Sequence, residues 1–190
     1  MKKFLRFGAA SAVVAASLGM STVAQAQAQD SASADAVAEI LTALTLELDT
    51  GSALDFGTMV VTGAGGVSLD ASTGTLDCLI ATIVCSGTTR LAAFSITAGT
   101  PDKNVTINFD TPSVTLFNTA GIGAAYELEL DNFNSNALEV TDTTTLGTYY
   151  EVKLDEGGLG AFLVGGDLTF DGTEVAGTYE GTFDVSVEYS

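Results

Sequence analysis

The chain has 190 residues, of which 24 are Asp or Glu, six are Lys or Arg and none is His, so its formal charge is −18. A charge of this size and sign repels nucleic acids and anionic membrane surfaces, which are bound through basic patches. The lack of His removes the most common general base and metal ligand, and we expect a protein without enzymatic activity.

The first 26 residues have the pattern of an export signal. Lys2, Lys3 and Arg6 precede an apolar stretch at 9–18, and the triplets at 24–26 and 26–28 are small-x-small cleavage candidates. The apolar stretch is shorter than the roughly 20 residues of a membrane-spanning helix. We therefore expect cleavage after residue 26 or 28 and release to the periplasm, the cell surface or the medium, without a membrane span. The mature chain would keep three basic and 24 acidic residues, a formal charge of −21.

The next segment, residues 27–37, is rich in Ala and Ser. One interpretation is a disordered leader. The other is an extended segment that is donated to another molecule, because alternate residues of a strand share a face. That face would carry Ala32, Ala34, Ala36 and Ala38.

From residue 38 onward, short runs of alternating apolar and polar residues are separated by Gly, Asp, Asn and Thr, which indicates half-buried antiparallel strands. The segment at 38–48 also fits a helical period, but its alternation favours a strand. The pattern predicts one all-β domain over 38–190, a sandwich or barrel. Its expected strands lie at 38–48, 54–61, 66–69, 91–97, 105–109, 113–117, 125–133, 148–154, 161–164, 167–170 and 178–189.

Two cysteines, Cys78 and Cys85, are separated by six residues. In an exported chain such a pair is most simply a disulfide that closes a short loop. A zinc site is disfavoured because two cysteines without any His supply only half of the usual ligands.

Oxygen-bearing side chains cluster in two expected turns and make calcium the one cofactor worth considering. They are Asp131, Asn134 and Asn136 in the first turn, and Asp155 and Glu156 in the second. Neither turn has the spacing of a known calcium loop, and Asn and Asp favour turns through their own backbone chemistry. Solvated turns without metal are therefore the simpler interpretation.

The segment at 178–189 has the most regular alternation of the chain. Asp184, Ser186 and Glu188 lie on one face, and a one-residue slip would bury these polar side chains. Its opposite face is predicted to join the core. That face carries Tyr179, Phe183, Val185, Val187 and Tyr189.

Five segments together resemble a secreted bacterial family known as domain of unknown function 4402. They are LDFGTMV at 54–60, LAAFSITAGTP at 91–101, LELDNFNSN at 128–136, GAFLVGGDLTF at 160–170 and AGTYEGTFDVSVEY at 176–189. This family is similar in layout to spore coat protein U and to fimbrial (pilin) subunits. The resemblance implies an exported antiparallel β-sandwich of immunoglobulin- or pilin-like layout, with no assigned activity.

The similarity to pilins also concerns the spacing of two residues. Pilins have a glycine fourteenth from the end and an aromatic residue at the penultimate position of the last strand, and Gly177 and Tyr189 occupy these positions here. In pilins, an extended strand from a neighbour completes the sandwich after delivery by an export chaperone. The resemblance therefore implies self-assembly by strand exchange, with a chaperone as a second partner.

Two functions follow as hypotheses. The first is an exported structural or adhesive surface protein, such as a fimbria-like or coat subunit. The alternative is a monomeric, secreted or periplasmic binding module whose acidic loops hold a ligand or calcium.

Overall fold

The computed structural model describes residues 32–78, 80–142 and 147–190. The chain divides into two compact units, Met1–Ala38 and Glu39–Ser190. In the first unit, residues 32–38 are exposed and belong to no helix or strand. The predicted export signal and residues 27–31 lie outside the described residues. The second unit holds every strand of the described part.

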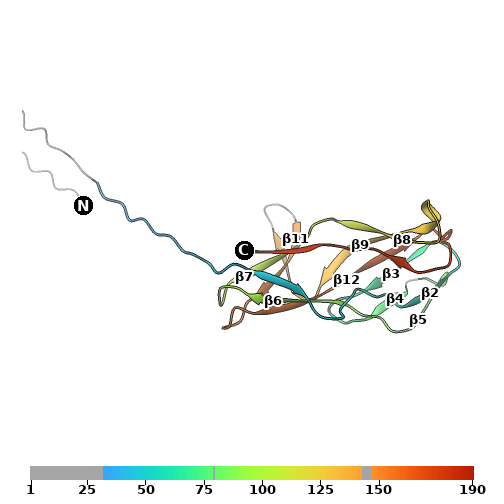
Figure 1. Ribbon diagram of the computed structural model, residues 1–190, viewed down its shortest axis with the longest axis horizontal. Helices are drawn as coiled ribbons and strands as arrows, with labels where there is room; N and C mark the ends of the chain where they lie inside the picture. Colours follow the sequence, from blue (N-terminus) through green and yellow to red (C-terminus); the bar gives the residue numbers. More distant parts are fainter. Residues whose placement is uncertain (1–31, 79, 143–146) are drawn as a thin grey trace, which may run out of the picture. The chain divides into compact units, whose positions relative to one another are not determined.

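The larger sheet is built around two long antiparallel strands, β9 and β12, which lie side by side (Figure 1). Its strand order is β1-β6-β12-β9-β8-β13, and β3 pairs with both β12 and β4. A single turn of 3-10 helix, Ala124–Tyr126, precedes β9. The strands are β1 (Thr45–Leu48), β3 (Gly65–Leu69), β4 (Leu76–Cys78), β6 (Ala92–Ala98), β8 (Ser113–Asn118), β9 (Glu127–Ser135), β12 (Gly160–Phe170) and β13 (Tyr179–Glu180).

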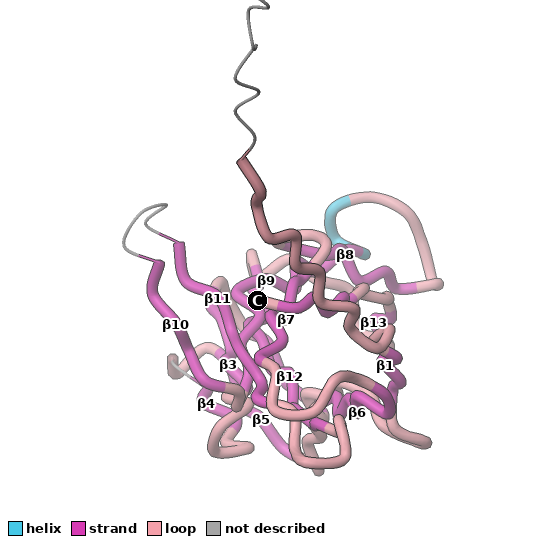
Figure 2. The backbone as a smooth tube through the Cα atoms, turned by 90° about the vertical axis from the view of Figure 1, so that its left-hand side faces the viewer, coloured by secondary structure: helices cyan, strands magenta, loops and turns pink. Residues whose placement is uncertain are grey.

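The second sheet has the order β10-β11-β7-β14, and a separate ribbon pairs β2 with β5. All strand pairs are antiparallel, and the fold is an all-β antiparallel sandwich, as the sequence predicts. Figure 2 looks nearly along the strands and shows them arranged around the interior. These strands are β2 (Thr58–Val61), β5 (Ile83–Ser86), β7 (Asn104–Phe109), β10 (Leu138–Asp142), β11 (Gly147–Lys153) and β14 (Val185–Tyr189).

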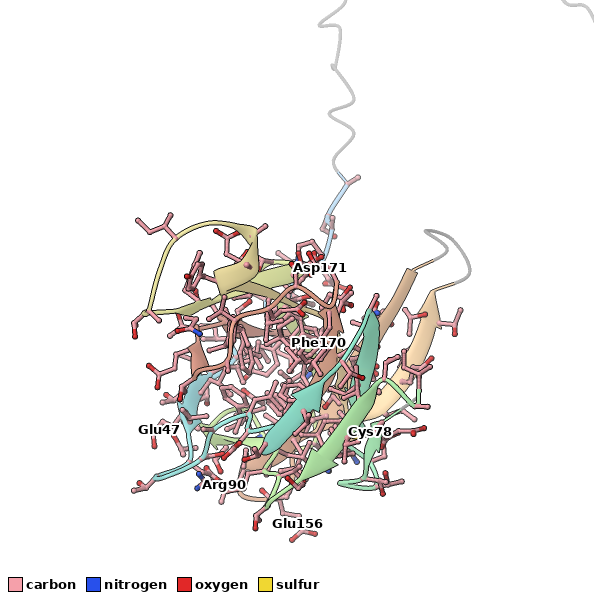
Figure 3. The ribbon with its side chains drawn as sticks, turned by 90° about the vertical axis from the view of Figure 1, so that its right-hand side faces the viewer. Glu47, Cys78, Arg90, Glu156, Phe170 and Asp171 are labelled. Carbon is pink, nitrogen blue, oxygen red and sulfur yellow. A yellow bond between two sulfur atoms is a disulfide. The ribbon has the colours of Figure 1, made fainter. Side chains whose placement is uncertain are left out.

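Two apolar clusters form the core, and β12 contributes to both because its even-numbered side chains all point inward. Phe162 and Val164 belong to one cluster, and Leu168 and Phe170 belong to the other. Figure 3 shows Phe170 among the packed side chains, whereas Glu47, Arg90 and Glu156 lie at the periphery. A fully buried side chain of this size contributes roughly 1.5–3 kcal/mol. The alternation of side chains along β12 thus places apolar residues in both clusters of the core.

Two predicted strands, 161–164 and 167–170, are in fact one. The sequence suggested a break at Gly165 and Gly166, but both glycines are buried inside β12. A Cβ atom at Gly165 would overlap the carbonyl oxygen of Leu69 on a neighbouring strand. The glycine is therefore required for close strand packing, and it does not end the strand.

The predicted strand at 178–189 is two strands. β13 pairs with β8 in the larger sheet, whereas β14 pairs with β7 in the second sheet, and residues 181–184 connect them. At Gly181, a Cβ atom would lie 2.7 Å from a methyl carbon of Leu116. The chain therefore changes sheets at a glycine that can pass close to β8.

The remaining differences concern short elements. Of the predicted strand at 38–48, only Thr45–Leu48 is in a strand, and this region has no helix. Strands β4, β5 and β10 were not expected from the sequence. They have three to five residues, which is too short for alternation to be distinguished from a turn.

Candidate functional site

Strand β14 is an edge strand, because among the described residues it pairs only with β7. The Asp110 amide donates to the Asp184 carbonyl at 3.2 Å, and the Ser190 amide donates to that of Asn104 at 3.2 Å. In an antiparallel ladder, every second residue directs its backbone groups to the partner strand. Ser186 and Glu188 therefore face β7. The N–H and C=O groups of Val185, Val187 and Tyr189 point the other way, where no described strand pairs with them.

The side chains of this C-terminal segment alternate between core and solvent. Phe183, Val185, Val187 and Tyr189 are half-buried against the cluster that contains Phe162, and Tyr179 and Phe183 contact the cluster that contains Phe170. On the opposite face, Glu188 accepts a hydrogen bond from the Asn108 side chain at 3.1 Å. The apolar face of β14 is therefore directed at the core but is only partly covered.

Strand β1 forms a similar edge in the larger sheet, where its single described partner is β6. The Asp49 amide donates to the Ala93 carbonyl at 2.9 Å, so the backbone groups of Leu46 and Leu48 point away from β6. Leu48 lies opposite Phe94, a residue that is 9% exposed. Nevertheless, Leu48 is 53% exposed. The inner face of the sandwich is thus uncovered at β1 as well.

Tyr189 connects the two edges at one end. Its hydroxyl donates to the Thr42 carbonyl at 2.6 Å and accepts from the Thr100 amide at 2.7 Å. The Thr42 amide in turn donates to the Thr100 hydroxyl at 2.7 Å. This set of three hydrogen bonds, which we call the Tyr189 clasp, fixes the segment just before β1 against the end of β14.

Phe183 connects the sheets at the other end of β14. Its ring lies 6.4 Å from that of Phe94 on β6 and 5.0 Å from that of Phe133 on β9. Between Phe183 and the Tyr189 clasp lie the half-buried side chains of β14 and β1. We call this region the open edge. It consists of the outward-facing backbone and inward-facing side chains of Val185, Val187 and Tyr189 on β14, and of Leu46 and Leu48 on β1.

Gly177 is the other residue of the pilin-like spacing. Its backbone passes close to the side chain of Asn118. A Cβ atom at this position would overlap the side-chain amide of Asn118. Asn118 is 3% exposed, donates to the Val175 carbonyl at 3.2 Å and accepts from the Ala120 amide at 3.0 Å. The glycine therefore has a local packing role.

Cys78 and Cys85 form a disulfide, which confirms the pairing expected from the sequence. Cys78 is on β4 at the border of the larger sheet, and Cys85 is on β5 of the two-stranded ribbon. No strand pairing joins the ribbon to that sheet among the described residues. The disulfide is therefore a covalent cross-link between them in addition to the chain segments that lead from β2 to β3 and from β4 to β5.

Most of the residues considered as calcium ligands use a side-chain oxygen to accept hydrogen bonds from backbone amides. The Asn134 carbonyl oxygen accepts from the Ala71 amide at 2.7 Å, and that of Asn136 accepts from the Leu163 amide at 2.7 Å. Asp155 accepts from the amides of Gly157 and Leu159, and Glu156 is exposed. In the described part of the chain, no three carboxylate, Cys or His groups lie close enough together to hold a metal.

Asp131 differs from the other candidates. It lies opposite Asp167 in the β9–β12 pair, and its buried Oδ1 has no hydrogen-bond partner among the described residues. Burial raises the pKa of the Asp131 carboxyl, and the charges of Glu129 and Asp167 raise it further. This arrangement disfavours the ionised carboxylate, which is the form that would bind a cation.

The fold is a β-sandwich whose strand β14 is paired on one side only among the described residues. The chain belongs to the family described as "Domain of unknown function (DUF4402)", whose sequence profile matches residues 46–189. This match spans the open edge and confirms the resemblance noted from the five sequence segments. Searches against curated proteins and against solved structures gave no match. The described residues include no helix with the length and apolar character needed to span a bilayer.

Proposed function

We propose that the protein is an exported, non-enzymatic structural or adhesive surface subunit that assembles when a strand from another molecule adds to the open edge. The observation that carries this proposal is β14 itself. The backbone groups of Val185, Val187 and Tyr189 are unpaired within the described residues, and the apolar side chains of the same residues are only half-buried. An added strand would form hydrogen bonds with these backbone groups and cover these apolar side chains.

Strand β14 of the open edge lacks several of the features that usually prevent such pairing. Soluble proteins block free edges with inward-pointing charges, prolines or bulges. The charged residues of this segment, Asp184 and Glu188, point away from the core, and β14 contains no proline. Its pairing with β7 runs without a register shift. We infer that the edge is kept available for a partner.

The disulfide and the charge fit an exported subunit. Disulfides persist in oxidising compartments outside the cytoplasm. The three basic residues of the described part all pair with carboxylates: Arg90 with Asp55 at 3.5 Å, Lys103 with Glu39 at 2.8 Å, and Lys153 with Asp102 at 3.2 Å. Among the described residues, the other carboxylates have no Lys or Arg partner. Such an acidic surface favours solubility until a specific contact forms.

The register of β14 provides a sharp test. Proline at position 187 would remove an N–H that points to the open side and would place its ring there, while the bonds of residues 186 and 188 to β7 remain possible. Light scattering across a concentration series should show that the wild-type exported chain associates and that Val187→Pro stays monomeric. Val187→Ala is the matched control, because it removes side-chain bulk but keeps the N–H, and it should still associate.

Two results would overturn the proposal. If Val187→Pro associates like the wild type while its circular dichroism is unchanged, the edge of β14 is not the contact. If the wild type is monomeric at every concentration and gains thermal stability with calcium, the alternative of a monomeric binding module with acidic loops is favoured.

A further inference from the structure

We propose that the protein binds a small organic cation of the quaternary ammonium class in a cavity between β7 and β11. The cavity is separate from the open edge, because β7 lies between β11 and β14 in the second sheet. The proposal is therefore independent of assembly by strand addition. It is carried by the fork between the two strands, by the aromatic rings that line this fork, and by the sign of the charges around it.

The cavity exists because β7 and β11 separate before either strand ends. Their pairing stops at the pair Tyr150 and Ile107. Beyond this point β7 continues beside β14 as far as Phe109, whereas β11 continues beside β10 through Thr148 (Figure 2). The fork holds a cavity of about 340 Å³. Binding sites for small molecules have volumes of roughly 300–1,000 Å³, so the cavity is large enough for a small ligand.

The fork also leaves backbone groups without a strand partner. The Leu154 amide donates to the Lys103 carbonyl at 2.9 Å, so odd-numbered residues of β7 and even-numbered residues of β11 direct their backbone groups toward each other. The next such pair after the end of the ladder would be Phe109 and Thr148, which the described pairing does not include. Their backbone groups therefore add hydrogen-bonding capacity to the wall of the cavity.

Aromatic rings make up much of the lining. The cavity is lined by residues 107–109 of β7, by Phe133 of β9 and by residues 148–150 of β11. The ring of Phe109 is stacked on that of Phe133 at a centroid distance of 5.2 Å and is nearly perpendicular to that of Tyr150, at 6.3 Å and 77°. All three side chains are half-buried. Rings gathered in this way resemble the aromatic cages that bind quaternary ammonium groups.

The charges near the cavity are negative. Glu139 lies directly opposite Tyr150 in the β10–β11 pair, so the two side chains share a face of the sheet. Asn108, in the lining, donates a hydrogen bond to Glu188 at 3.1 Å. Burial raises the pKa of the Tyr150 hydroxyl, and the charge of Glu139 raises it further. None of the described lining residues is Lys or Arg, so these surroundings favour a positively charged ligand.

The composition of the lining also distinguishes among cations. Metal ions such as calcium need several oxygen ligands, and a primary ammonium group is strongly hydrated and needs acceptors for its N–H groups. The described lining residues include no carboxylate. A quaternary ammonium group has no N–H to leave unpaired and is attracted to the faces of aromatic rings. This class of cation therefore suits the cavity best.

Choline is the probe for the test, because it combines a trimethylammonium group with a hydroxyl. Neohexyl alcohol has the same shape but no charge, since carbon replaces the nitrogen, and ethanolamine keeps a charge but lacks the methyl groups. Titration calorimetry should show saturable binding of choline and binding of each analogue that is weaker by roughly tenfold or more. In NMR spectra, the methyl protons of bound choline should shift upfield because they lie against ring faces.

Substitutions test the location of the site. Tyr150→Leu and Phe109→Leu each remove one ring and should weaken choline binding roughly tenfold. Tyr150→Phe keeps the ring and is the matched control. Phe117→Leu removes a ring on β8 that is 54% exposed and lies outside the cavity lining. Both controls should bind choline like the wild type, and circular dichroism checks that every variant is folded.

Three results would overturn the proposal. If the wild type shows no saturable binding of choline, the cavity does not hold this class of ligand. If neohexyl alcohol binds as tightly as choline, the positive charge is not recognised. If folded Tyr150→Leu and Phe109→Leu bind choline like the wild type, the site lies elsewhere. None of these results bears on the open edge, which Val187→Pro tests separately.

Discussion

The hydroxyl of Tyr189 donates a hydrogen bond to the carbonyl of Thr42, 147 positions earlier in the chain, at 2.6 Å. The same hydroxyl accepts from the Thr100 amide at 2.7 Å. A single phenol thus holds the entry to β1, the turn after β6 and the end of β14 together. It holds the stretch that leads into β1 at the turn between β6 and β7.

Tyr189→Phe should therefore loosen the entry to β1 while the aromatic ring stays in place. We expect a loss of about 1–2 kcal/mol in the free energy of unfolding, because two hydrogen bonds disappear. Urea denaturation measures this loss, and hydrogen exchange of the Thr100 amide should accelerate. The Asp49 amide, which donates to Ala93, serves as an internal control and should be unaffected. Unchanged exchange at Thr100 would show that the clasp does not form in solution.

Phe183→Ala tests which face of the C-terminal segment is the core face. The ring contacts Phe94 and Phe133, so truncation should cost about 3 kcal/mol, the low end for Phe to Ala because the ring is only half-buried. Glu188→Gln changes the exposed face, keeps an acceptor for Asn108 and should cost less than about 0.5 kcal/mol. The measurement is the urea midpoint of each variant. Equal midpoints would mean that the assignment of faces is reversed.

Alternation along the sequence was sufficient to predict the inward face of this segment, because period 2 is a local property of a strand. Val185, Val187 and Tyr189 contact the core, whereas Asp184, Ser186 and Glu188 are exposed. Alternation could not show that the segment changes sheets at Gly181, since that depends on the close approach to Leu116 on β8. Nor could it show that β14 is an edge strand, because edge position depends on which distant strands lie beside it.

The functional residues that sequence analysis missed are those held by long-range contacts. Thr42 and Thr100 have no motif, and only the folded chain brings them to Tyr189. Leu48 lies opposite buried Phe94, and its 53% exposure marks a missing neighbour that no local pattern records. The disulfide was predictable because the chain has only two cysteines and an expected export signal, which leaves one simple pairing.

Asp131 should make the stability of the protein depend on pH. Burial raises the pKa of this carboxyl in the folded chain, so stability is lost as the pH rises through that raised value. Asp131→Asn should consequently raise the urea midpoint at pH 7. The gain should vanish below the ordinary pKa of 3.8, where folded and unfolded chains both carry the proton. A lower midpoint for the variant at pH 7 would contradict the unfavourable burial of this charge.

Asp171 provides the opposite case and a control for the effect of removing one negative charge. Hydrogen bonds from the Thr173 hydroxyl and amide lower the pKa of the Asp171 carboxyl. The stabilisation that this carboxylate gives the folded chain is present above its pKa in the unfolded chain. It is lost as the pH falls through the lowered pKa of the folded chain. Asp171→Asn should therefore slightly reduce stability at pH 7, and its effect should have the opposite sign to that of Asp131→Asn.

Removal of the disulfide should destabilise the two-stranded ribbon. For a loop of this length, the chain-entropy estimate gives a loss of about 2.5 kcal/mol in the double variant Cys78→Ala/Cys85→Ala. Reductant should lower the wild-type urea midpoint toward that of the variant, and the variant should not respond to reductant. A wild type that is insensitive to complete reduction would show that the link between β4 and β5 contributes little to stability.

The central claim is that the open side of β14 pairs with a strand of another molecule. It is tested most directly by hydrogen exchange of individual β14 amides at two protein concentrations. The amides of Ser186 and Glu188, which face β7, should be protected at both. Those of Val185, Val187 and Tyr189 should exchange rapidly in dilute solution and become protected when the protein is concentrated. If these three amides exchange at the same rate at both concentrations while particle mass increases, the molecules associate through another surface and the account is wrong.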